Sequence, residues 1–383
     1  MRRIVRVVAL MTVAPAAILS TGGSASARLA CGPTFAQVSS PNGASGNTFV
    51  SDADATSPAN AWAVGGGDSG GFSIHWDGSS WQAKAVPAVG PGETLGAVGM
   101  AGPHDVWAVG SFDNPHGKAR TLALRRTGST WVRVPSRNDG LGDNDLYELS
   151  VVSTDDVWAA GTATVGGVDR VLLQHWNGVK WKLVSFPALV STDNFLEGMT
   201  AAGPGDVWVS VQFADPMTHA DRVTTFHRTG STWQHVTLTQ PSAGDVEPRA
   251  LLAIAPNDVW MAGFFHKNGK ELVLLERWNG THWTRFTGVN ASGSGETFLE
   301  GLAALGPHAV YAFGGTLHGS EDAPFAERYD GTSWKRVTTN LPSGGSFFYG
   351  GAAAPGSNRH VWGVGFVQPG GGTEQTLVEQ ACP

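Results

Sequence analysis

Apolar residues along this chain alternate with polar or small residues in short runs, and turn-forming residues separate the runs. The stretch 196–238 is representative, with alternating runs at 196–202, 207–211, 223–228 and 231–238. A period of two is typical of β-strands that bury one face. No stretch has the period of an amphipathic helix. The pattern therefore predicts an all-β chain of short strands joined by tight turns.

This four-strand unit repeats, and two motifs mark it. The first reads DVWAVG with variants, and its aromatic residue recurs every 45 to 52 positions, at Trp62, Trp107, Trp158, Trp208, Trp260, Tyr311 and Trp362. The second, W(D/N)GxxW with variants, ends 26 to 28 positions before the next first-motif aromatic, at Trp81, Trp131, Trp181, Trp233, Trp283 and Trp334. Repeats of about 40–50 residues with four strands are typical of β-propeller blades. The sequence predicts a seven-bladed β-propeller.

Residues 28–383 are expected to form this single propeller domain. The predicted blades are 48–87, 94–136, 146–187, 195–239, 248–288, 297–341 and 347–382.

The seventh unit stops before its fourth strand, and the missing strand is predicted at the other end of the chain. The segment 31–35 (CGPTF) aligns with 77–81 (DGSSW), and Phe35 precedes Trp62 by 27 residues, as in the other units. Residues 32–40 are therefore expected to form the outer strand of blade seven and to close the ring.

The same alignment places Cys31 and Cys382 at one interrupted hairpin. Neighbours across a hairpin satisfy the short Cα separation of a disulfide, which is therefore predicted. In an alternative interpretation Cys31 is a lipidated N-terminus and Cys382 is a free thiol. Arg28 stands where an apolar residue is usual in that motif, which favours the disulfide.

Other repeated residues are interpreted as structural. Asp-Gly and Asn-Gly pairs before the fourth strands, at 77–78, 177–178, 279–280 and 330–331, predict two-residue type I′ hairpins. The first-motif column Asn60, Asp105, Asp156, Asp206 and Asp258 is expected to accept turn hydrogen bonds, and His75, His175 and His227 share another structural column. All 15 tryptophans fall in repeat columns, which indicates packing between blades rather than a sugar-stacking platform.

The first 27 residues read as a secretory signal peptide. Three arginines precede an apolar run that ends in an Ala-Ser-Ala exit, which favours general secretion over twin-arginine export. Without this segment the chain keeps 22 basic and 32 acidic side chains and a net charge of −10. No basic cluster or further apolar span is present, so nucleic acid and a membrane span are poor expectations.

The blades also resemble those of the kelch and galactose-oxidase group of propellers. The clearest unit is VYAFGG at 310–315 followed by ERYDGTSW at 327–334. The repeats are similar, too, to secreted actinobacterial propellers of unassigned function. The kelch resemblance extends over the whole mature chain at the level of the fold. Most units, however, keep only one of the two glycines that stand at 314–315 in the clearest unit. Galactose oxidase's cysteine–tyrosine cross-link has no counterpart, because both cysteines lie at the ends.

One variable column is the candidate binding site. Directly upstream of the expected inner strands it reads Ser51, Gly96, Tyr147, Glu197, Arg249, Glu300 and, with one inserted residue, Gly350. Equivalent positions surround the channel mouth, so Tyr147, Glu197, Arg249 and Glu300 are expected to converge there with Tyr349. An aromatic rim is expected from Phe195, Phe298, Phe347, Phe348 and Tyr349. Alternatively these are solvated loop ends, with Arg249 paired to its acidic neighbours.

Function is predicted only as a class. Repeat positions account for most of the chemistry, and no catalytic motif or metal-ligand spacing stands out, so neither a metal nor a cofactor is expected. We expect a secreted, monomeric, non-catalytic binding or scaffold protein for a glycan, cell-wall or protein ligand. The alternative is an extracellular carbohydrate-active hydrolase or lyase that uses Glu197 and Glu300. A purely structural role is a third hypothesis.

Overall fold

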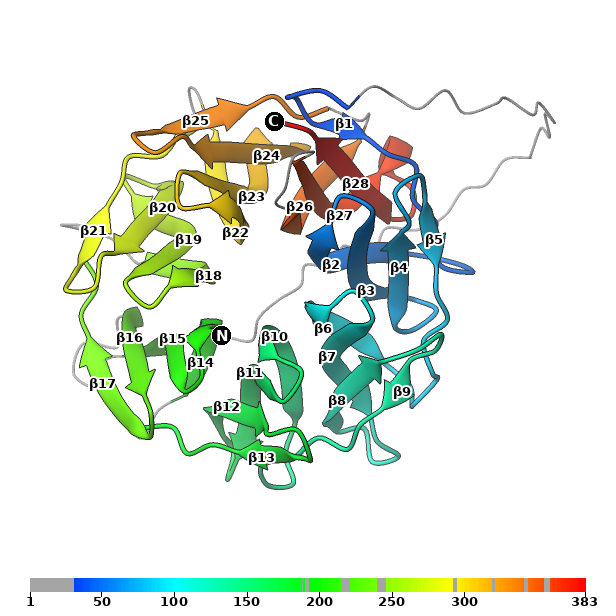
Figure 1. Ribbon diagram of the computed structural model, residues 1–383, viewed down its shortest axis with the longest axis vertical. Helices are drawn as coiled ribbons and strands as arrows, with labels where there is room; N and C mark the ends of the chain where they lie inside the picture. The colour runs from blue at the N-terminus through cyan, green and yellow to red at the C-terminus, as the bar shows by residue number, and fades with distance from the viewer. Residues whose placement is uncertain are drawn as a thin grey trace. The chain divides into compact units, whose positions relative to one another are not determined.

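The computed structural model describes residues 31–187, 189, 193–214, 221–239, 246–291, 295–318, 321–340, 344–354 and 359–383. These form seven four-stranded antiparallel sheets arranged as the blades of a β-propeller (Figure 1). The expected signal peptide lies outside the described residues. No helix in the described ranges is long and apolar enough to cross a membrane.

Six blades use consecutive strands, ordered from the axis outwards. Blade one has β2 (Thr48–Ser57), β3 (Asn60–Gly67), β4 (Phe72–Trp76) and β5 (Trp81–Ala83); blade two has β6 (Thr94–Gly102), β7 (Asp105–Asp113), β8 (Ala119–Arg126) and β9 (Val132–Arg133). Blade three has β10 (Asn144–Ser153), β11 (Asp156–Val165), β12 (Val168–Trp176) and β13 (Trp181–Leu183); blade four has β14 (Asn194–Gly203), β15 (Asp206–Ala214), β16 (Asp221–Thr229) and β17 (Thr232–Val236). Blade five has β18 (Val246–Ala255), β19 (Asp258–Lys267), β20 (Lys270–Trp278) and β21 (Trp283–Arg285); blade six has β22 (Glu296–Gly306), β23 (Ala309–His318), β24 (Glu321–Tyr329) and β25 (Trp334–Val337).

Blade seven joins the two ends of the chain. It contains β26 (Gly345–Ala354), β27 (His360–Gln368), β28 (Gln375–Ala381) and, outermost, β1 (Ala36–Gln37). A disulfide links Cys31 to Cys382, with their Cα atoms 5.4 Å apart. The predicted closure and disulfide are confirmed. The paired strand is shorter than the predicted 32–40.

Neighbouring blades are held together by rings around the first-motif aromatics. His227 stacks on Trp208 of its own blade at 4.1 Å, and Trp278 and Trp283 of the next blade lie 4.9 and 5.4 Å from it. Aromatic or cationic side chains likewise surround Trp62, Trp107, Trp158, Trp260, Trp362 and Tyr311. The tryptophans therefore pack between blades.

Inner strands of adjacent blades also touch, and side-chain acceptors join some of them. In blade one, Asp52 and Asp54 accept the backbone N–H groups of Val98 and Met100 in blade two. Burial raises the pKa of Asp52 to about 7 and that of Asp54 to about 6, although the hydrogen bonds from the backbone lower both pKa values in part.

The first-motif aspartate does not serve the turn as expected. Asp156 Oδ1 lies 2.8 Å from His175 Nε2, and Asp258 accepts two bonds from Arg277 at 2.7 and 2.8 Å. The imidazole of His175 and the guanidinium of Arg277 also lie over the tryptophan of the motif. The aspartate therefore orients the group that covers one face of the tryptophan.

The prediction of type I′ turns before the outer strands is wrong. Trp76 pairs with Trp81, which leaves a four-residue loop in which only Gly78 has a positive φ, of 92°. Asp77 Oδ1 accepts the N–H groups of Ser79 and Ser80, so the carboxylate shapes the turn. Two-residue turns with both central residues at positive φ occur instead between second and third strands, at 166–167 and 268–269.

The closing disulfide is expected to contribute strongly to stability, because it restrains nearly the whole chain in the unfolded state. Replacing Cys31 and Cys382 together by Ser should lower the free energy of unfolding by up to about 5 kcal/mol, measured by denaturant unfolding. The chain has only these two cysteines, so reductant should lower the wild type equally and leave the double variant unchanged. An equal midpoint for reduced and oxidised wild type would contradict this expectation.

Candidate functional site

A β-bulge interrupts every inner strand at the same repeat position. The pairing between first and second strands skips one residue in each blade. The skipped residues, here termed the bulge ring, are Ser51, Gly96, Tyr147, Glu197, Arg249, Glu300 and Tyr349. Bulges re-aim a side chain and commonly lie near functional sites.

The bulge explains the glycine that ends the first motif. Gly161 pairs with Leu146 just before the bulge, and a Cβ on Gly161 would lie 1.9 Å from the carbonyl oxygen of Asp145. The same contact recurs at Gly65, Gly110, Gly263, Gly314 and Gly365. Blade four has Val211 at this position. The repeated glycine therefore belongs to the scaffold, whereas the bulge residue across from it varies.

The bulge ring corrects two details of the expected column. Its members lie inside the inner strands rather than before them, as Tyr147 does in β10. In blade seven the pairing skips Tyr349, so no inserted residue is needed and Gly350 is not in the column.

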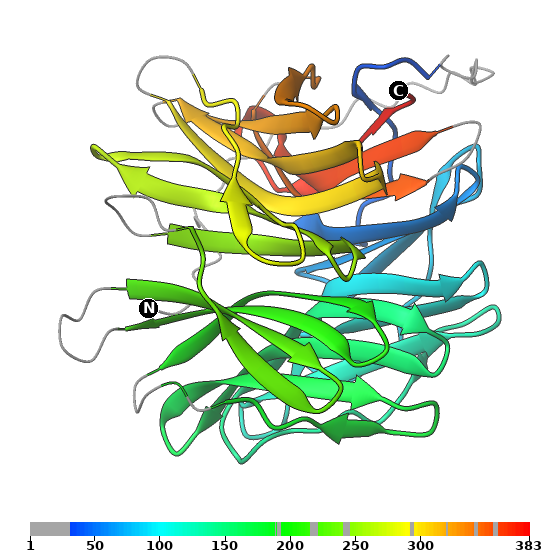
Figure 2. The ribbon, with the colours of Figure 1, turned by 60° about the vertical axis from the view of Figure 1, so that its left-hand side comes forward.

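The bulge ring lies toward one end of the propeller axis. We call this end the upper face: it carries the loops between second and third strands and those that lead from an outer strand to the next blade. Each inner strand runs down from this face, and its bulge falls in the first half of the strand. Figure 2 shows the blades from the side, with those of β10–β17 in green.

Arg249 gathers carboxylates from three blades. Its Nη1 lies 3.1 Å from Glu197 Oε2, its Nη2 2.6 Å from Glu247 Oε2, and its Nε 3.9 Å from Glu300 Oε1. The guanidinium also lies 5.2 Å from the ring centre of Phe264. The structure therefore brings Glu197, Arg249 and Glu300 together, in the ion-paired form that the sequence left open.

The members of this cluster differ in exposure. The side chain of Glu197 is only 4% exposed, whereas those of Arg249 and Glu300 are 19% and 27% exposed. A ligand at the upper face would therefore meet Glu300 and Arg249 before Glu197.

Tyr147 occupies the neighbouring bulge and joins blade three to blade four. Its hydroxyl donates to the carbonyl oxygen of Leu196 at 3.1 Å and lies 2.7 Å from the hydroxyl of Thr162. These bonds hold the ring of Tyr147 against Leu196, the residue that precedes Glu197.

Tyr349 belongs to an aromatic row on the other side of the ring. Its centroid lies 5.6 Å from both Phe347 and Phe366. Burial raises the pKa of its hydroxyl, and nearby acidic groups, among them Glu374 and Glu300, raise it further. The hydroxyl is therefore a neutral hydrogen-bonding group at physiological pH.

Phe298 extends this row toward Arg249. It lies 5.3 Å from Phe264 and 6.5 Å from Phe347. The expected rim is confirmed for Phe298 and Phe347, and Phe195 is also partly exposed. Phe348 is wrong as a rim residue, because it is fully buried against Phe35 and Phe313.

Sequence reasoning missed Glu247 and Phe264. Glu247 lies two residues before Arg249, and Phe264 is its pairing partner in β19. Phe195, Phe298 and Phe347 hold the position of Glu247 in their own blades. This second column, two residues before the bulge, was the signal that could have found Glu247.

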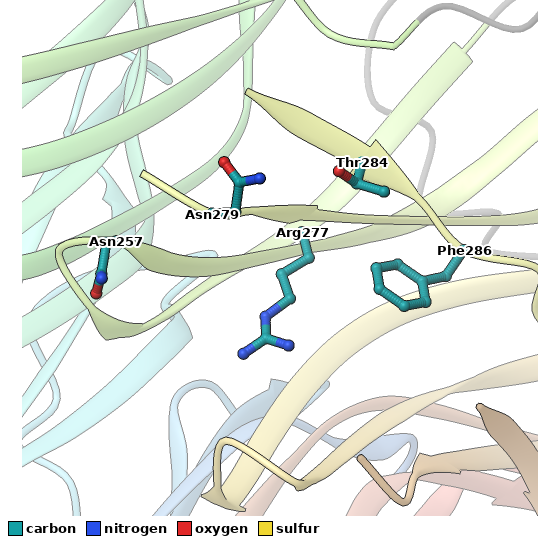
Figure 3. A pocket seen from close by; sticks show the side chains of 5 residues that line it. All are labelled: Asn257, Arg277, Asn279, Thr284 and Phe286. Carbon is teal, nitrogen blue, oxygen red and sulfur yellow. The ribbon is translucent and has the colours of Figure 1, made fainter. Parts of the chain in front are cut away.

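Two surface pockets lie elsewhere, on the opposite, lower face. One of about 390 Å³ is lined by Asn257, Arg277, Asn279, Thr284 and Phe286 (Figure 3). Another of about 340 Å³ includes Ala59, His75 and Asp77, which are the equivalents of Asn257, Arg277 and Asn279. The two pockets share these three repeat positions, and neither includes a bulge-ring residue.

One group in the described residues has spacing suited to a metal, formed by His360, Cys31 and Cys382. Both sulfur atoms are already bonded to each other in the disulfide. His360 stacks on Trp362 at 5.5 Å, as cationic groups do in other blades. The group is therefore part of the ring closure.

Comparison with family models and with curated proteins finds no match. Several solved structures share the fold of this chain at low sequence identity. A PL25 ulvan lyase superposes with a TM-score of 0.59 at 11% identity, covering 90% of this chain and 94% of that one. YCF48 bound to D1 peptide gives 0.54 at 13% identity, with coverages of 93% and 99%. A GH74 xyloglucanase from Xanthomonas campestris gives 0.56 at 16% identity, covering 86% of this chain and 53% of that one.

These likenesses establish the fold alone. The chain is a seven-bladed β-propeller. The propellers that share its architecture include carbohydrate-active enzymes and a peptide-binding protein. The kelch resemblance stays a prediction.

Removing the arginine from this cluster should be costly, because it strands a buried carboxylate. Arg249→Met is expected to lower the free energy of unfolding by about 3–5 kcal/mol, and adding Glu197→Gln should restore part of the loss. Lys118→Met is the matched control, since its 3.3 Å pair with Asp143 is exposed and should cost less than about 1 kcal/mol. Denaturant unfolding measures all three. Equal losses for Arg249→Met and Lys118→Met would contradict a buried network.

Proposed function

We propose that this protein is a secreted, non-catalytic recognition or scaffold propeller that binds a glycan, cell-wall or protein ligand on its upper face. Tyr147, Glu197, Arg249, Glu300 and Tyr349 of the bulge ring are the proposed ligand-binding residues. The observation that carries the proposal is the bulge ring itself: a repeated backbone irregularity whose side chain changes from blade to blade. A rigid scaffold with variable groups at one end is typical of a grafted binding site.

The charge of the cluster narrows the ligand class. One guanidinium faces three carboxylates, so the group around Arg249 carries excess negative charge. An aromatic row that runs from Phe264 to Tyr349 lies beside it. Aromatic faces and carboxylate acceptors suit a neutral or amino-bearing sugar, or a basic peptide, and disfavour a polyanion.

The alternative is an extracellular carbohydrate-active hydrolase or lyase that uses Glu197 and Glu300. General acid catalysis requires a carboxyl group that holds a proton until it reacts. A neighbouring arginine favours the ionised carboxylate, and Glu197 is nearly inaccessible. The geometry supports binding better than catalysis.

The cellular setting of the proposal rests on sequence and chemistry. The N-terminal segment predicts export, and a disulfide persists in an oxidising compartment. We propose a secreted monomer with no cofactor, no metal and no nucleic-acid partner.

Binding is tested by retention of the purified protein on insoluble polysaccharides of three charge classes and on basic and acidic peptide arrays. Retention is expected on a neutral or amino-bearing glycan or on basic peptides. Glu300→Gln combined with Tyr349→Leu should weaken it by at least about tenfold, since tenfold in affinity corresponds to about 1.4 kcal/mol.

Asn279→Ala on the lower face is the matched control and should retain wild-type binding. Unchanged retention in the upper-face variant would remove the bulge ring from consideration. Release of soluble oligosaccharide with turnover would favour the hydrolase or lyase instead.

A further inference from the structure

A different repeat column, which lies in the third strands, holds buried polar groups that the proposed function does not use. One residue before the position that His75, His175 and His227 occupy in their third strands, it reads Ile74, Leu124, Gln174, Phe226, Glu276, Glu327 and Glu379. The four polar members are all 0% exposed. Burying such groups is costly unless they are hydrogen-bonded.

Each polar member binds the loop that enters its own blade at the upper face. Gln174 Oε1 accepts the N–H of Arg137 at 2.8 Å, and its Nε2 donates to the carbonyl of the same residue at 2.7 Å. The amide thus binds both backbone groups of one residue, accepting from its N–H and donating to its carbonyl oxygen.

Glu327 and Glu379 accept a backbone N–H in the same way but show no donated hydrogen bond within the described part of the chain. Glu327 Oε2 accepts the N–H of Val289 at 2.9 Å, and Glu379 Oε2 that of Asn340 at 3.0 Å. The second oxygen of each carboxyl is buried and has no hydrogen-bond partner among the described residues. Glu327 Oε1 faces Gly288, where a Cβ would lie only 2.9 Å away.

Glu276 is the member of the column that has a guanidinium partner. Its Oε2 accepts the N–H of Thr239, and its Oε1 accepts a 2.7 Å bond from Arg285 on β21. Burial raises the pKa of Glu276, and this guanidinium partly offsets the rise.

The groups that face Glu327 and Glu379 supply no such partner. Arg336 lies opposite Glu327 on β25, but its guanidinium lies over the ring of Phe325 at 5.3 Å. Ala312 pairs with Glu327 on the other side. Glu379 lies between Gly363 and Gln37, which are both uncharged.

We propose that Glu327 and Glu379 are proton-dependent positioning residues for the upper face. Each holds its loop as a neutral carboxylic acid, with the second oxygen donating to the loop backbone as the amide of Gln174 does. Loss of the proton to solvent removes that donor, leaves an unpaired buried charge and loosens the loop.

The two loops lead directly into the candidate site, so this inference rests on the proposed function. The loop held by Glu327 enters β22, which carries Glu300, and the loop held by Glu379 enters β26, which carries Tyr349. Release would therefore disturb two neighbouring members of the bulge ring.

Burial supports this protonation state. It raises the pKa of Glu327 from 4.5 to about 8 and that of Glu379 to about 7, and the backbone bonds only partly oppose it. Between pH 4.5 and these values the folded chain binds more protons than the unfolded chain, so its stability falls as pH rises.

Hydrogen exchange of the Val289 and Asn340 amides tests whether the protonated carboxyl groups hold their loops, and it requires no ligand. Rates at pH 6 and pH 9, corrected for intrinsic exchange, should show protection falling by about tenfold or more in the wild type. Glu327→Gln should preserve protection at Val289 while Asn340 still loses it, and Glu379→Gln should do the reverse. Each variant is thus the control for the other.

Gln174→Glu gives an independent test at a loop that the amide now holds. The Arg137 amide, pH-independent in the wild type, should lose protection between pH 6 and pH 9. Equal protection of the wild-type Val289 and Asn340 amides at both pH values would overturn the proposal. A pH-independent Arg137 amide in the Gln174→Glu variant would overturn it as well.

Retention on the ligand found above, compared at pH 6 and pH 9, tests the link to binding. The wild type should lose retention at pH 9, and the Glu327→Gln/Glu379→Gln double variant should keep it. If hydrogen exchange at Val289 and Asn340 speeds up at pH 9 while retention on the ligand stays constant, the two carboxyl groups have no role at the binding site. Failure to find a ligand bears only on the proposed function, because exchange is measured without one.

Discussion

The whole architecture depends on the burial of one aromatic side chain between each pair of blades. A single four-stranded sheet has two faces and cannot cover both. In most blades the first-motif aromatic is covered by a histidine or arginine of its own third strand and by side chains of the next blade, as Trp208 is by His227, Trp278 and Trp283. A chain organised this way is stable only when the last blade meets the first, because otherwise two apolar faces stay exposed.

A second constraint acts near the axis, where backbones approach closely. The bulge brings the carbonyl of the inner strand against the second strand, and the motif glycine makes room for it. Gly96 leaves space in the same way, since a Cβ there would lie 2.8 Å from the Cα of Tyr147. The scaffold therefore requires glycine at most of the second-strand positions and also at Gly96, which is the bulge residue of blade two. In the other blades the bulge residue differs from blade to blade without disturbing the aromatic packing.

Most of the fold could be predicted from the sequence, because the aromatic columns carry both the period and the packing. The count of seven blades, the closure through β1 and the Cys31–Cys382 disulfide all followed from motif spacing. Spacing does not report backbone conformation, so the turns at 77–80 were predicted with the wrong geometry: the Asp77 carboxylate, rather than two positive φ angles, shapes them.

The candidate site was only partly predictable, for a related reason. The column of Glu197, Arg249 and Glu300 was visible, but a bulge shifts alternation by one residue. Glu247 and Phe348 lie before the bulge, where the alternation still holds. Glu247 shares the partly exposed position of Phe347 and was overlooked, and Phe348, the next residue, was assigned to the rim instead of the core. Contacts across blades, such as the aspartate that orients a cation over tryptophan, depend on neighbours far apart in the chain and leave no local pattern.

The position of the disulfide also determines how the molecule bears mechanical load. Its two ends are the two sides of one interrupted hairpin, and the only strand that overlaps them is the two-residue β1. A pull on the termini is carried by the covalent S–S bond, so the blades are not peeled apart in sequence. After reduction the same pull acts on the hydrogen bonds of the N-terminal segment, which include the two β1 pairs and the bonds from Cys382 N–H to the carbonyl of Gly32 and from Val38 N–H to the carbonyl of Val378. A propeller pulled at both ends would therefore keep its shape for as long as the bond stays oxidised.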